Sequence, residues 1–434
     1  MRRRAASRAP GVSHRIARKY RSAAVAAPTT TVLALLCGVG SGQAQEAVRA
    51  SLAGAEAAEA RRKAVASIGY YNLMAGNSMW RVTGGLGTQL TDNVNLSPSD
   101  EAEGDINFTP SVGVNMFMPV TERNALNFDV NFGYSAYVKN TDLNQFYINP
   151  GTGLSFDVFV GDWLINFHDR FSISTQAYQN PTVSGSGDYR SLQNDLGVTG
   201  LWDLNKVQVT LGYDYTYLNQ TSGNAPQTVG SGNVFFATAG YAFQPTTTFG
   251  VQLGGGLNSY TQNPTLDTSS QFNAGFFANA QITDYLSLRG DMGYLLYWPN
   301  YIVPVSDPNV SGVYFDLSLV NRLTKHITQS LIGGRNLNTG LSGSAIAEIF
   351  VRWDVAWAIF RKLTINTSFY FTHGEYQPQP GETYDYFGWS IGFGRPITKK
   401  LSGSFTYQGV IKNDSIPSLD YNLNTLSLRF NYNF

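Results

Sequence analysis

The side chains that most often carry out chemistry are few and scattered in this sequence. Beyond residue 44 the histidines are His168, His326 and His373, and no two of them have the spacing of metal ligands on one strand. The Ser-Gly-Ser stretches at 342–344 and 402–404 lack the strand–turn–helix setting of a nucleophile elbow. The sequence therefore offers no candidate catalytic residue and no metal site.

Glycine and cysteine lead to the same conclusion. The run Gly254-Gly255-Gly256 has no helix pattern after it, so it does not predict a phosphate-binding loop. The single cysteine, Cys37, lies in the N-terminal region, which leaves the rest of the chain without thiol chemistry. We predict a protein that is not an enzyme and that uses no cofactor.

The triplet His168-Asp169-Arg170 breaks the local pattern, because Asp169 falls on the apolar face of a predicted strand, between Phe167 and Phe171. A bulge, or a position at the membrane interface, would reduce the cost of that carboxylate. A bulge at His168 and Asp169 could also create a functional His/Arg site inside a barrel. Both interpretations remain open at this point.

The composition indicates strands that cross a membrane. Charged residues make up 14% and aromatic residues 13% of the 434 residues, with 44 glycines. After the N-terminal region no apolar run is long enough for a transmembrane helix, and the best helix candidate, Ile346–Phe360, is interrupted by charges. Membrane-like composition without apolar runs is typical of alternating transmembrane strands.

Residues 1–44 resemble an export signal. Eight basic residues precede an apolar stretch at Thr31–Gly40, and small residues lead to a predicted cleavage after Ala44. A transit peptide, a twin-arginine signal, a lipidated Cys37 and a start codon further downstream are the alternatives. Without these residues the chain has 22 basic and 30 acidic residues, and it carries no sign of nucleic-acid binding.

The next segment, residues 45–79, is predicted to be periplasmic. Gln45–Ala66 is rich in Ala, Glu and Arg, which predicts a short helix. This helix is either a solvated segment that leads to the barrel, a plug for the lumen or a docking site for a partner. Ser67–Met79 is predicted to be a linker. The barrel is predicted to occupy 80–434.

Alternation of apolar and polar residues is the main argument for the fold. In the last strand, five apolar residues from Leu426 to Phe434 alternate with five polar ones from Thr425 to Asn433. Successive side chains of a strand point to opposite faces, so one face is apolar and the other polar. Strands of about 11–13 residues exceed the usual length in soluble proteins and can cross a bilayer when tilted.

Turn signals divide the chain into about 18 strands, with 16 as the alternative if the Gly-rich strand Trp80–Leu90 does not form. Short polar turns recur at 121–124, 161–162, 203–206, 244–247, 283–284, 324–325, 361–362 and 398–400. Longer breaks lie between them, at 92–104, 179–188, 219–232 and 298–311 for example. We predict an all-β, antiparallel up-and-down transmembrane barrel whose outer loops are too short to reach into the lumen.

Aromatic residues are predicted to serve the membrane and assembly. Those near strand ends, such as Trp163, Trp298 and Tyr384, suit the headgroup layer. Phe430, Tyr432 and Phe434 form a C-terminal aromatic signal of the kind that barrel-assembly machinery recognises.

Charged residues on the polar faces are the candidates for lining the lumen. They are nearly balanced in sign, which predicts cross-strand pairing and weak ion selectivity rather than an arginine ladder. The candidates are Arg81, Asp129, Asp157, Arg170, Asp195, Asp214, Arg289, Asp291, Asp316, Arg322, Glu348, Arg352, Asp354 and Arg429.

Two short segments carry a family resemblance. Thr91–Pro98 with Asp105–Gly113, and Asn166–Ser172, resemble segments of the family called β-barrel porin 2. The resemblance implies a barrel in the bacterial outer membrane, and some family members accompany exopolysaccharide export systems.

We therefore expect an outer-membrane, porin-like channel for small hydrophilic solutes. The alternatives are a barrel through which exopolysaccharide is exported and a plugged structural barrel. The expected partners are outer-membrane lipid and the barrel-assembly machinery, with periplasmic export proteins added in the export alternative.

Overall fold

The structure, a computed structural model, describes residues 71–434 except 122, 224, 304–307, 340–344, 361 and 378–380. The predicted signal peptide with its cleavage at Ala44, the predicted helix at 45–66 and the start of the predicted linker lie outside the described residues. No helix in the described part of the chain is long and apolar enough to cross a membrane.

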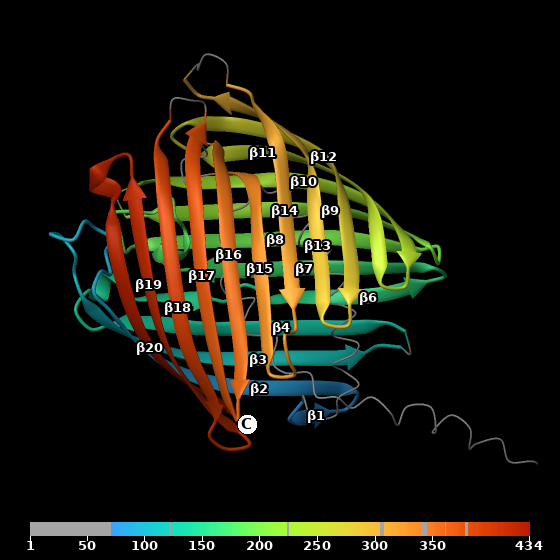
Figure 1. The fold of residues 1–434 in the computed structure, drawn as a ribbon, viewed down its shortest axis with the longest axis horizontal. Coiled ribbons are helices and arrows are strands. Elements are labelled where there is room, and N and C mark those ends of the chain that lie inside the picture. The colour runs from blue at the N-terminus through green and yellow to red at the C-terminus, as the bar shows by residue number, and fades with distance from the viewer. Residues whose placement is uncertain are drawn as a thin grey trace, which may run out of the picture. The chain divides into compact units, whose positions relative to one another are not determined.

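Strands dominate the described residues (Figure 1). Their bounds are β1 Leu73–Ala75, β2 Ser78–Thr91, β3 Asp105–Pro119, β4 Ala125–Tyr137, β5 Gln145–Ile148, β6 Gly153–Val160, β7 Trp163–Ser174, β8 Tyr189–Asp203, β9 Val207–Ser222, β10 Ala225–Gln244, β11 Thr247–Gln262, β12 Leu266–Thr283, β13 Leu286–Tyr301, β14 Val310–Asn321, β15 Ile327–Thr339, β16 Ala345–Ile359, β17 Leu363–Gln377, β18 Thr383–Pro396, β19 Leu401–Asp414 and β20 Tyr421–Asn433. Three 3₁₀ turns, η2 Thr141–Leu143, η3 Ala177–Gln179 and η4 Pro417–Leu419, lie in the connections.

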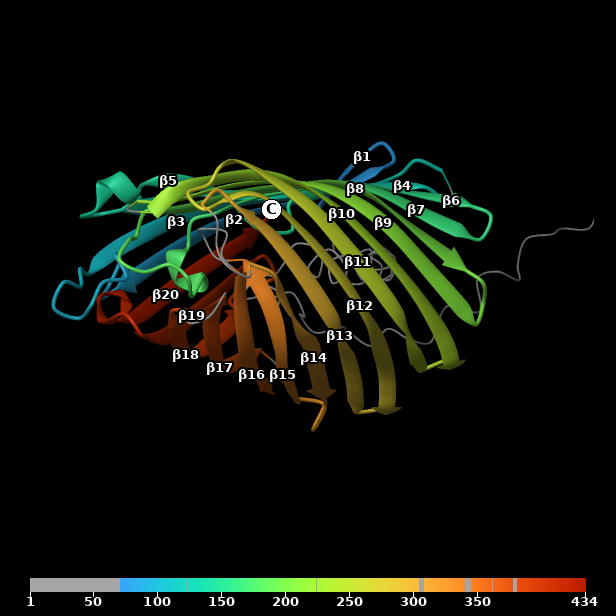
Figure 2. The same ribbon diagram turned by 90° about the horizontal axis from the view of Figure 1, so that it is seen from above.

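The sheet closes on itself. Each strand from β2 to β20 pairs antiparallel with its neighbours, and β20 pairs with β2 from Thr83↔Asn433 to Thr91↔Thr425. The strands β5 and β6 both pair with β4 and form one interrupted strand, while β1 is a short hairpin arm on β2. The barrel therefore has the predicted 18 strands, and a closed ladder satisfies the backbone hydrogen bonds of the wall (Figures 1 and 2).

The alternation in sequence becomes an apolar outside and a polar inside. On β12, Phe272 and Phe276 point outward and are exposed, whereas Gln271 and Asn273 point inward and are buried. The same division holds on β20, where Leu426 and its even-numbered neighbours face outward. An apolar outer surface over strands of this length is the surface that a bilayer covers.

Threonine explains why four of the turns at the end that holds Phe434 form where the sequence predicts them. In each turn the Oγ1 of a threonine accepts hydrogen bonds from the backbone N–H groups two and three residues later, at 2.9–3.3 Å. Such local bonds compete with the ladder and end a strand. The four residues are Thr121, Thr283, Thr324 and Thr398.

Three predicted boundaries are wrong. The break predicted at 298–311 begins too early, because β13 extends to Tyr301, and it ends too late, because β14 begins at Val310. The break predicted at 219–232 is almost entirely strand, because β9 extends to Ser222 and β10 begins at Ala225. The polar residues Asn219 and Gln220 pair in the β9–β10 ladder, so their polarity marks the inner face and the outer end of the strands rather than a loop. The linker predicted up to Met79 contains β1 and the start of β2.

Candidate functional site

The connection between β7 and β8, residues 175–188, folds back into the barrel; we call it the inner loop. Its Ala177 and Val183 are buried in one apolar cluster with Tyr384, Tyr386 and Val410, which point inward from β18 and β19. Those strands are not ladder neighbours of β7 or β8. The inner loop therefore crosses the lumen and packs against the opposite wall.

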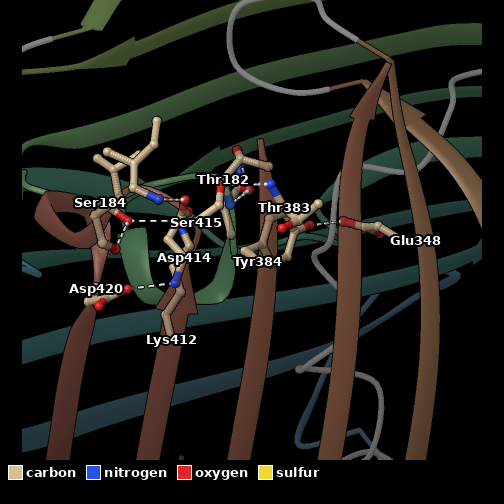
Figure 3. A network of polar contacts seen from close by, with 12 residues as sticks. Thr182, Ser184, Glu348, Thr383, Tyr384, Lys412, Asp414, Ser415 and Asp420 are labelled. Carbon is tan, nitrogen blue, oxygen red and sulfur yellow. Dashed lines mark hydrogen bonds and ion pairs between the residues drawn. The ribbon is translucent and has the colours of Figure 1, made fainter. Parts of the chain in front are cut away.

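Polar contacts fix the inner loop on that wall (Figure 3). The Nζ of Lys412 donates to the Oγ of Ser184 at 2.9 Å, and this hydroxyl donates in turn to the backbone oxygen of Leu419 at 2.9 Å. The hydroxyl of Tyr386 donates to the backbone oxygen of Tyr178. From the other side, the N–H of Gly185 donates to the backbone oxygen of Leu96 at 2.8 Å.

Lys412 is the centre of this attachment. Its ammonium also lies 2.9 Å from the Oδ2 of Asp414, and the side chains of the two residues are 1% and 0% exposed. The ring of Tyr384 lies 5.4 Å from the same ammonium, and its hydroxyl donates to Glu348 of β16. A buried charge pair of this kind is costly to break, because either partner alone would be an uncompensated charge away from water.

An acidic group beside this attachment has a shifted pKa. Glu382, in the connection before β18, is half-buried. This burial, together with the negative charge of the neighbouring Asp414, raises the pKa of its carboxyl to about 7, although the charge of Lys412 acts in the opposite direction. Glu382 therefore exchanges a proton near neutral pH, next to the pair that holds the inner loop.

The expectation that no outer loop reaches into the lumen is wrong. The connection is short, but the apolar residues Ala177 and Val183 give it a reason to turn inward, where tyrosines of the far wall cover them. Tyr384 belongs to this cluster and is 1% exposed, so it does not lie in the headgroup layer as predicted. Length alone did not indicate where the loop packs.

The predicted lumen residues divide into two groups by burial. Thirteen of the fourteen lie on strands with their side chains on the inner face, while Arg322 lies in the turn after β14. Asp157, Asp214, Glu348 and Asp354 are buried in the wall. The half-buried or exposed inward residues are Arg81, Asp129, Arg170, Asp195, Arg289, Asp291, Asp316, Arg352 and Arg429.

The buried acids have partners within the wall. The Nε2 of His168 lies 2.6 Å from the Oδ1 of Asp214, and its Nδ1 lies 3.0 Å from Asn166. On β16, the Nε of Arg352 contacts Asp354 at 2.8 Å, and Ser368 donates to the same carboxylate at 2.6 Å. Only the Ser368–Asp354 bond joins adjacent strands, β17 and β16; the His168–Asp214 contact reaches from β7 past β8 to β9, and the Arg352–Asp354 contact lies along β16.

Of the two explanations considered for the carboxylate at Asp169, a bulge or a position at the membrane interface, the bulge is absent. Strand β7 runs in unbroken register with β8, and with β6 as far as Arg170. Asp169 faces outward, where Asn194 of β8 donates to its Oδ1 at 2.6 Å. The irregularity that the sequence pattern suggested lies instead in the partner strand, between β5 and β6.

The two ends of the barrel differ in charge. Among the described residues, the outer connections hold eight acidic residues and one lysine, namely Asp92, Asp100, Glu101, Glu103, Asp142, Asp188, Glu382, Asp420 and Lys139. The turns at the opposite end hold two acidic and seven basic residues, namely Asp162, Asp284, Arg123, Lys206, Arg322, Lys325, Lys362, Lys399 and Lys400. The charged residues of the wall are nearly balanced in sign, as predicted, but the connections at the two ends of the barrel carry net charges of opposite sign.

These features define the class of the protein. The barrel is closed, antiparallel and 18-stranded, with an apolar outer face and a polar inner face. Its short turns lie at the end where β2 begins and β20 ends. This combination is that of a membrane barrel of the bacterial outer-membrane type. Within the described residues, no group of three or more His, Cys, Asp or Glu side chains could hold a metal ion.

Known proteins resemble this chain in structure but not in sequence. No family model matches the chain, and no curated protein sequence matches it. The outer membrane protein OpdK of Pseudomonas aeruginosa has a TM-score of 0.48 and 11% identity over 82% of this chain and 98% of that one. OccAB4 of Acinetobacter baumannii has a TM-score of 0.47 and 10% identity over 82% and 98%. The assignment to the class rests on this chain's own ladders and surface.

Sequence reasoning missed Lys412, Asp414 and Ser184. Alternation on β19 does place Lys412 and Asp414 on the inner face, since Phe405 and Tyr407 face outward. Following the alternation from the predicted turn at 398–400 as far as Asp414 would have identified both. Nothing local could have indicated Ser184, which lies 228 residues from Lys412 in the chain.

Proposed function

We propose that this barrel is a porin-like channel through which small hydrophilic solutes cross the outer membrane, with the inner loop forming its narrow part. The observation that carries the proposal is the set of charged inward side chains that stay accessible to water, such as Arg81, Arg289 and Arg429. Barrels of 16–18 strands leave room for an aqueous channel. The inner loop covers the wall formed by β16–β20, so it narrows the lumen on one side.

The charge distribution supports a preference among solutes. Acidic residues at the outer mouth concentrate cations where solutes enter, and fixed charge of one sign at a pore mouth biases the ions that pass. We propose that the channel favours neutral and cationic solutes over anionic ones.

Swelling of liposomes tests the channel directly. Vesicles that contain the refolded protein should swell in isotonic solutions of small sugars, and the rate should fall steeply as the sugar becomes larger. The heat-modifiable, folded band on a gel confirms that the barrel is intact. Vesicles that swell no faster than protein-free ones would favour the plugged structural barrel.

The alternative of exopolysaccharide export rests on the resemblance to β-barrel porin 2, carried by Thr91–Pro98, Asp105–Gly113 and Asn166–Ser172. It requires a periplasmic partner that docks on residues 45–66. Removing these residues after the signal would abolish export while leaving sugar uptake unchanged, whereas a simple channel needs no such partner.

A further inference from the structure

Three turns at the end with the short connections share one framework but differ in charge. In each, a large apolar residue precedes a threonine whose Oγ1 accepts hydrogen bonds from the backbone N–H groups two and three residues later. The apolar residues, Ile282, Leu323 and Ile397, are exposed to the same degree, by 55%, 55% and 53%. The turns are Ile282-Thr283-Asp284-Tyr285-Leu286, Leu323-Thr324-Lys325-His326-Ile327 and Ile397-Thr398-Lys399-Lys400-Leu401.

Basic residues gather on one side of this end. The β14–β15, β16–β17 and β18–β19 turns are successive, because β15 pairs with β16 and β17 pairs with β18 (Figure 1). We call the described residues of these turns, 322–326, 360, 362 and 397–400, the basic arc. Within it there is no Asp or Glu, whereas the described residues of the other five turns hold two acidic and two basic residues. The Lys and Arg residues of the basic arc are Arg322, Lys325, Lys362, Lys399 and Lys400.

Each turn of the basic arc also exposes a large apolar side chain, namely Leu323, Phe360 or Ile397. Phe360 is the extreme case, since it is 86% exposed and its φ is +52°, a left-handed conformation that bulky residues rarely adopt. An aromatic ring held out in this way gains free energy when an apolar medium covers it.

Two side chains of the basic arc lie against the outer face of the barrel, which the bilayer covers. The Cδ1 of Ile397 is 3.1 Å from the point where Gly403 would carry a Cβ, and Gly403 is the ladder partner of the outward-facing Phe430. The Nζ of Lys400 lies 5.9 Å from the ring centroid of Tyr432, which also faces outward. An apolar residue and a cation at the same edge of the lipid-facing surface match the acyl chain and the headgroup of a lipid.

We propose that the basic arc binds anionic phospholipids of the periplasmic leaflet. The short turns of such barrels face the periplasm, so the headgroups of that leaflet lie at this level. The lipid phosphates contact the Lys and Arg side chains, and the acyl chains cover Leu323, Phe360 and Ile397. A soluble acidic polymer would match the charge but leave these three apolar side chains in water. The site is on the outside of the barrel, so it does not depend on whether the lumen conducts.

Photo-crosslinking with two matched lipids tests the site. The protein is reconstituted in phosphatidylcholine nanodiscs that contain a small fraction of phosphatidylglycerol or of phosphatidylcholine, each with the same diazirine-bearing acyl chain. Crosslinked residues are mapped by mass spectrometry, and the ratio of phosphatidylglycerol to phosphatidylcholine labelling is taken for each turn. Since one Lys or Arg near the surface attracts anionic lipid roughly fivefold, we expect this ratio to be at least about fivefold higher at the basic arc than at 282–286. The turn at 282–286 is an internal control with the same framework and an aspartate.

Charge changes on the shared framework sharpen the test. Replacing the five Lys and Arg residues of the basic arc with glutamine should bring its labelling ratio down to near that of 282–286. Asp284→Lys should raise the ratio at 282–286 toward that of the basic arc, because the exposed Ile282 is already in place. The heat-modifiable band confirms that each variant is folded.

Equal ratios at the basic arc and at 282–286 in the wild type would overturn the proposal, and so would a ratio that survives the glutamine changes. In a last sample, soluble poly-glutamate is added to the wild type at a concentration equal to that of the labelled lipid. A preference for phosphatidylglycerol that persists supports lipid as the ligand. A preference that disappears would assign the basic arc to a soluble polyanion, and the proposal would fail.

Discussion

The two ends of this barrel are built from the same strands but differ in the length and charge of their connections and in the burial of their inward side chains. At the end with the short turns, threonine-based turns carry mostly basic residues, and inward side chains such as Arg429 remain exposed. At the outer end the connections are longer and mostly acidic, and inward side chains such as Tyr421 and Lys412 are buried under the inner loop. Alternation decides which way a side chain points, whereas the connections decide whether water reaches it.

This comparison changes how the wall is probed by mutation. Replacing Asp291, Glu348 and Asp354 together would not be a clean test of lumen charge. Glu348 accepts a hydrogen bond from Tyr384, and Asp354 is buried with Arg352, so two of the three changes would disturb packing. Charge effects are better sought in the exposed outer connections.

The largest effect, on insertion into the membrane, is expected from changes on the lipid-facing surface, which both ends share. Replacing Leu288, Val351 and Val355 with arginine places three charges on the apolar outer surface, at about 2–4 kcal/mol each near the bilayer midplane. We expect the triple variant to fail to insert, as measured by the absence of the heat-modifiable band in membrane fractions. Normal insertion would mean that the assignment of faces is wrong.

The next effect distinguishes the outer end from the opposite end. Lys412→Met leaves the carboxylate of Asp414 buried without its partner, and breaking such a pair costs about 3–5 kcal/mol. The temperature at which the barrel loses its heat-modifiable form should fall, and adding Asp414→Asn should recover part of the loss. Arg429→Met, an inward change at an exposed position, is the control and should shift this temperature little.

A smaller effect depends on pH. The pKa of Glu382 is raised to about 7 from an ordinary value of 4.5, so the folded state holds its proton more tightly than the unfolded state. This favours folding fully below about pH 4.5, and the contribution is lost as pH rises through 7. The unfolding temperature should therefore fall between pH 5 and pH 8, and Glu382→Gln should flatten this part of the profile. An unchanged profile in the variant would assign the dependence to other groups.

The smallest effect concerns ion selectivity. Replacing Asp100, Glu101 and Glu103 with their amides removes three exposed negative charges from the outer mouth. Cation preference, measured as a reversal potential across a planar bilayer, should decrease at 0.1 M salt. It should hardly change at 1 M salt, where the Debye screening length is about threefold shorter. An equal change at both salt concentrations would point to altered structure rather than charge.

The strands could be predicted from sequence because they repeat one local rule. Alternation over residues such as 425–434 identifies the faces, and a threonine with a polar neighbour identifies the turns. The inner loop could not be predicted in this way, because its position depends on Val183 meeting tyrosines more than 200 residues away in the chain. The end of the β14–β15 ladder at Phe315↔Arg335 is likewise not revealed by the alternating residues of these two strands.

The central claim is that the inner loop narrows a lumen that is otherwise open. Single-channel conductance of the wild type is compared with that of a variant in which residues 177–186 are replaced by a four-residue Gly-Ser linker, with a five-residue deletion at 99–103 as the control. If the claim holds, the wild type conducts and the inner-loop variant conducts at least about twofold better, because the narrowest section limits the current. The control deletion removes three acidic residues of the outer mouth, so the comparison is made at 1 M salt, where these charges are screened; there it leaves the conductance close to that of the wild type. Equal conductance of the wild type and the folded inner-loop variant, or no conductance from either, would contradict it.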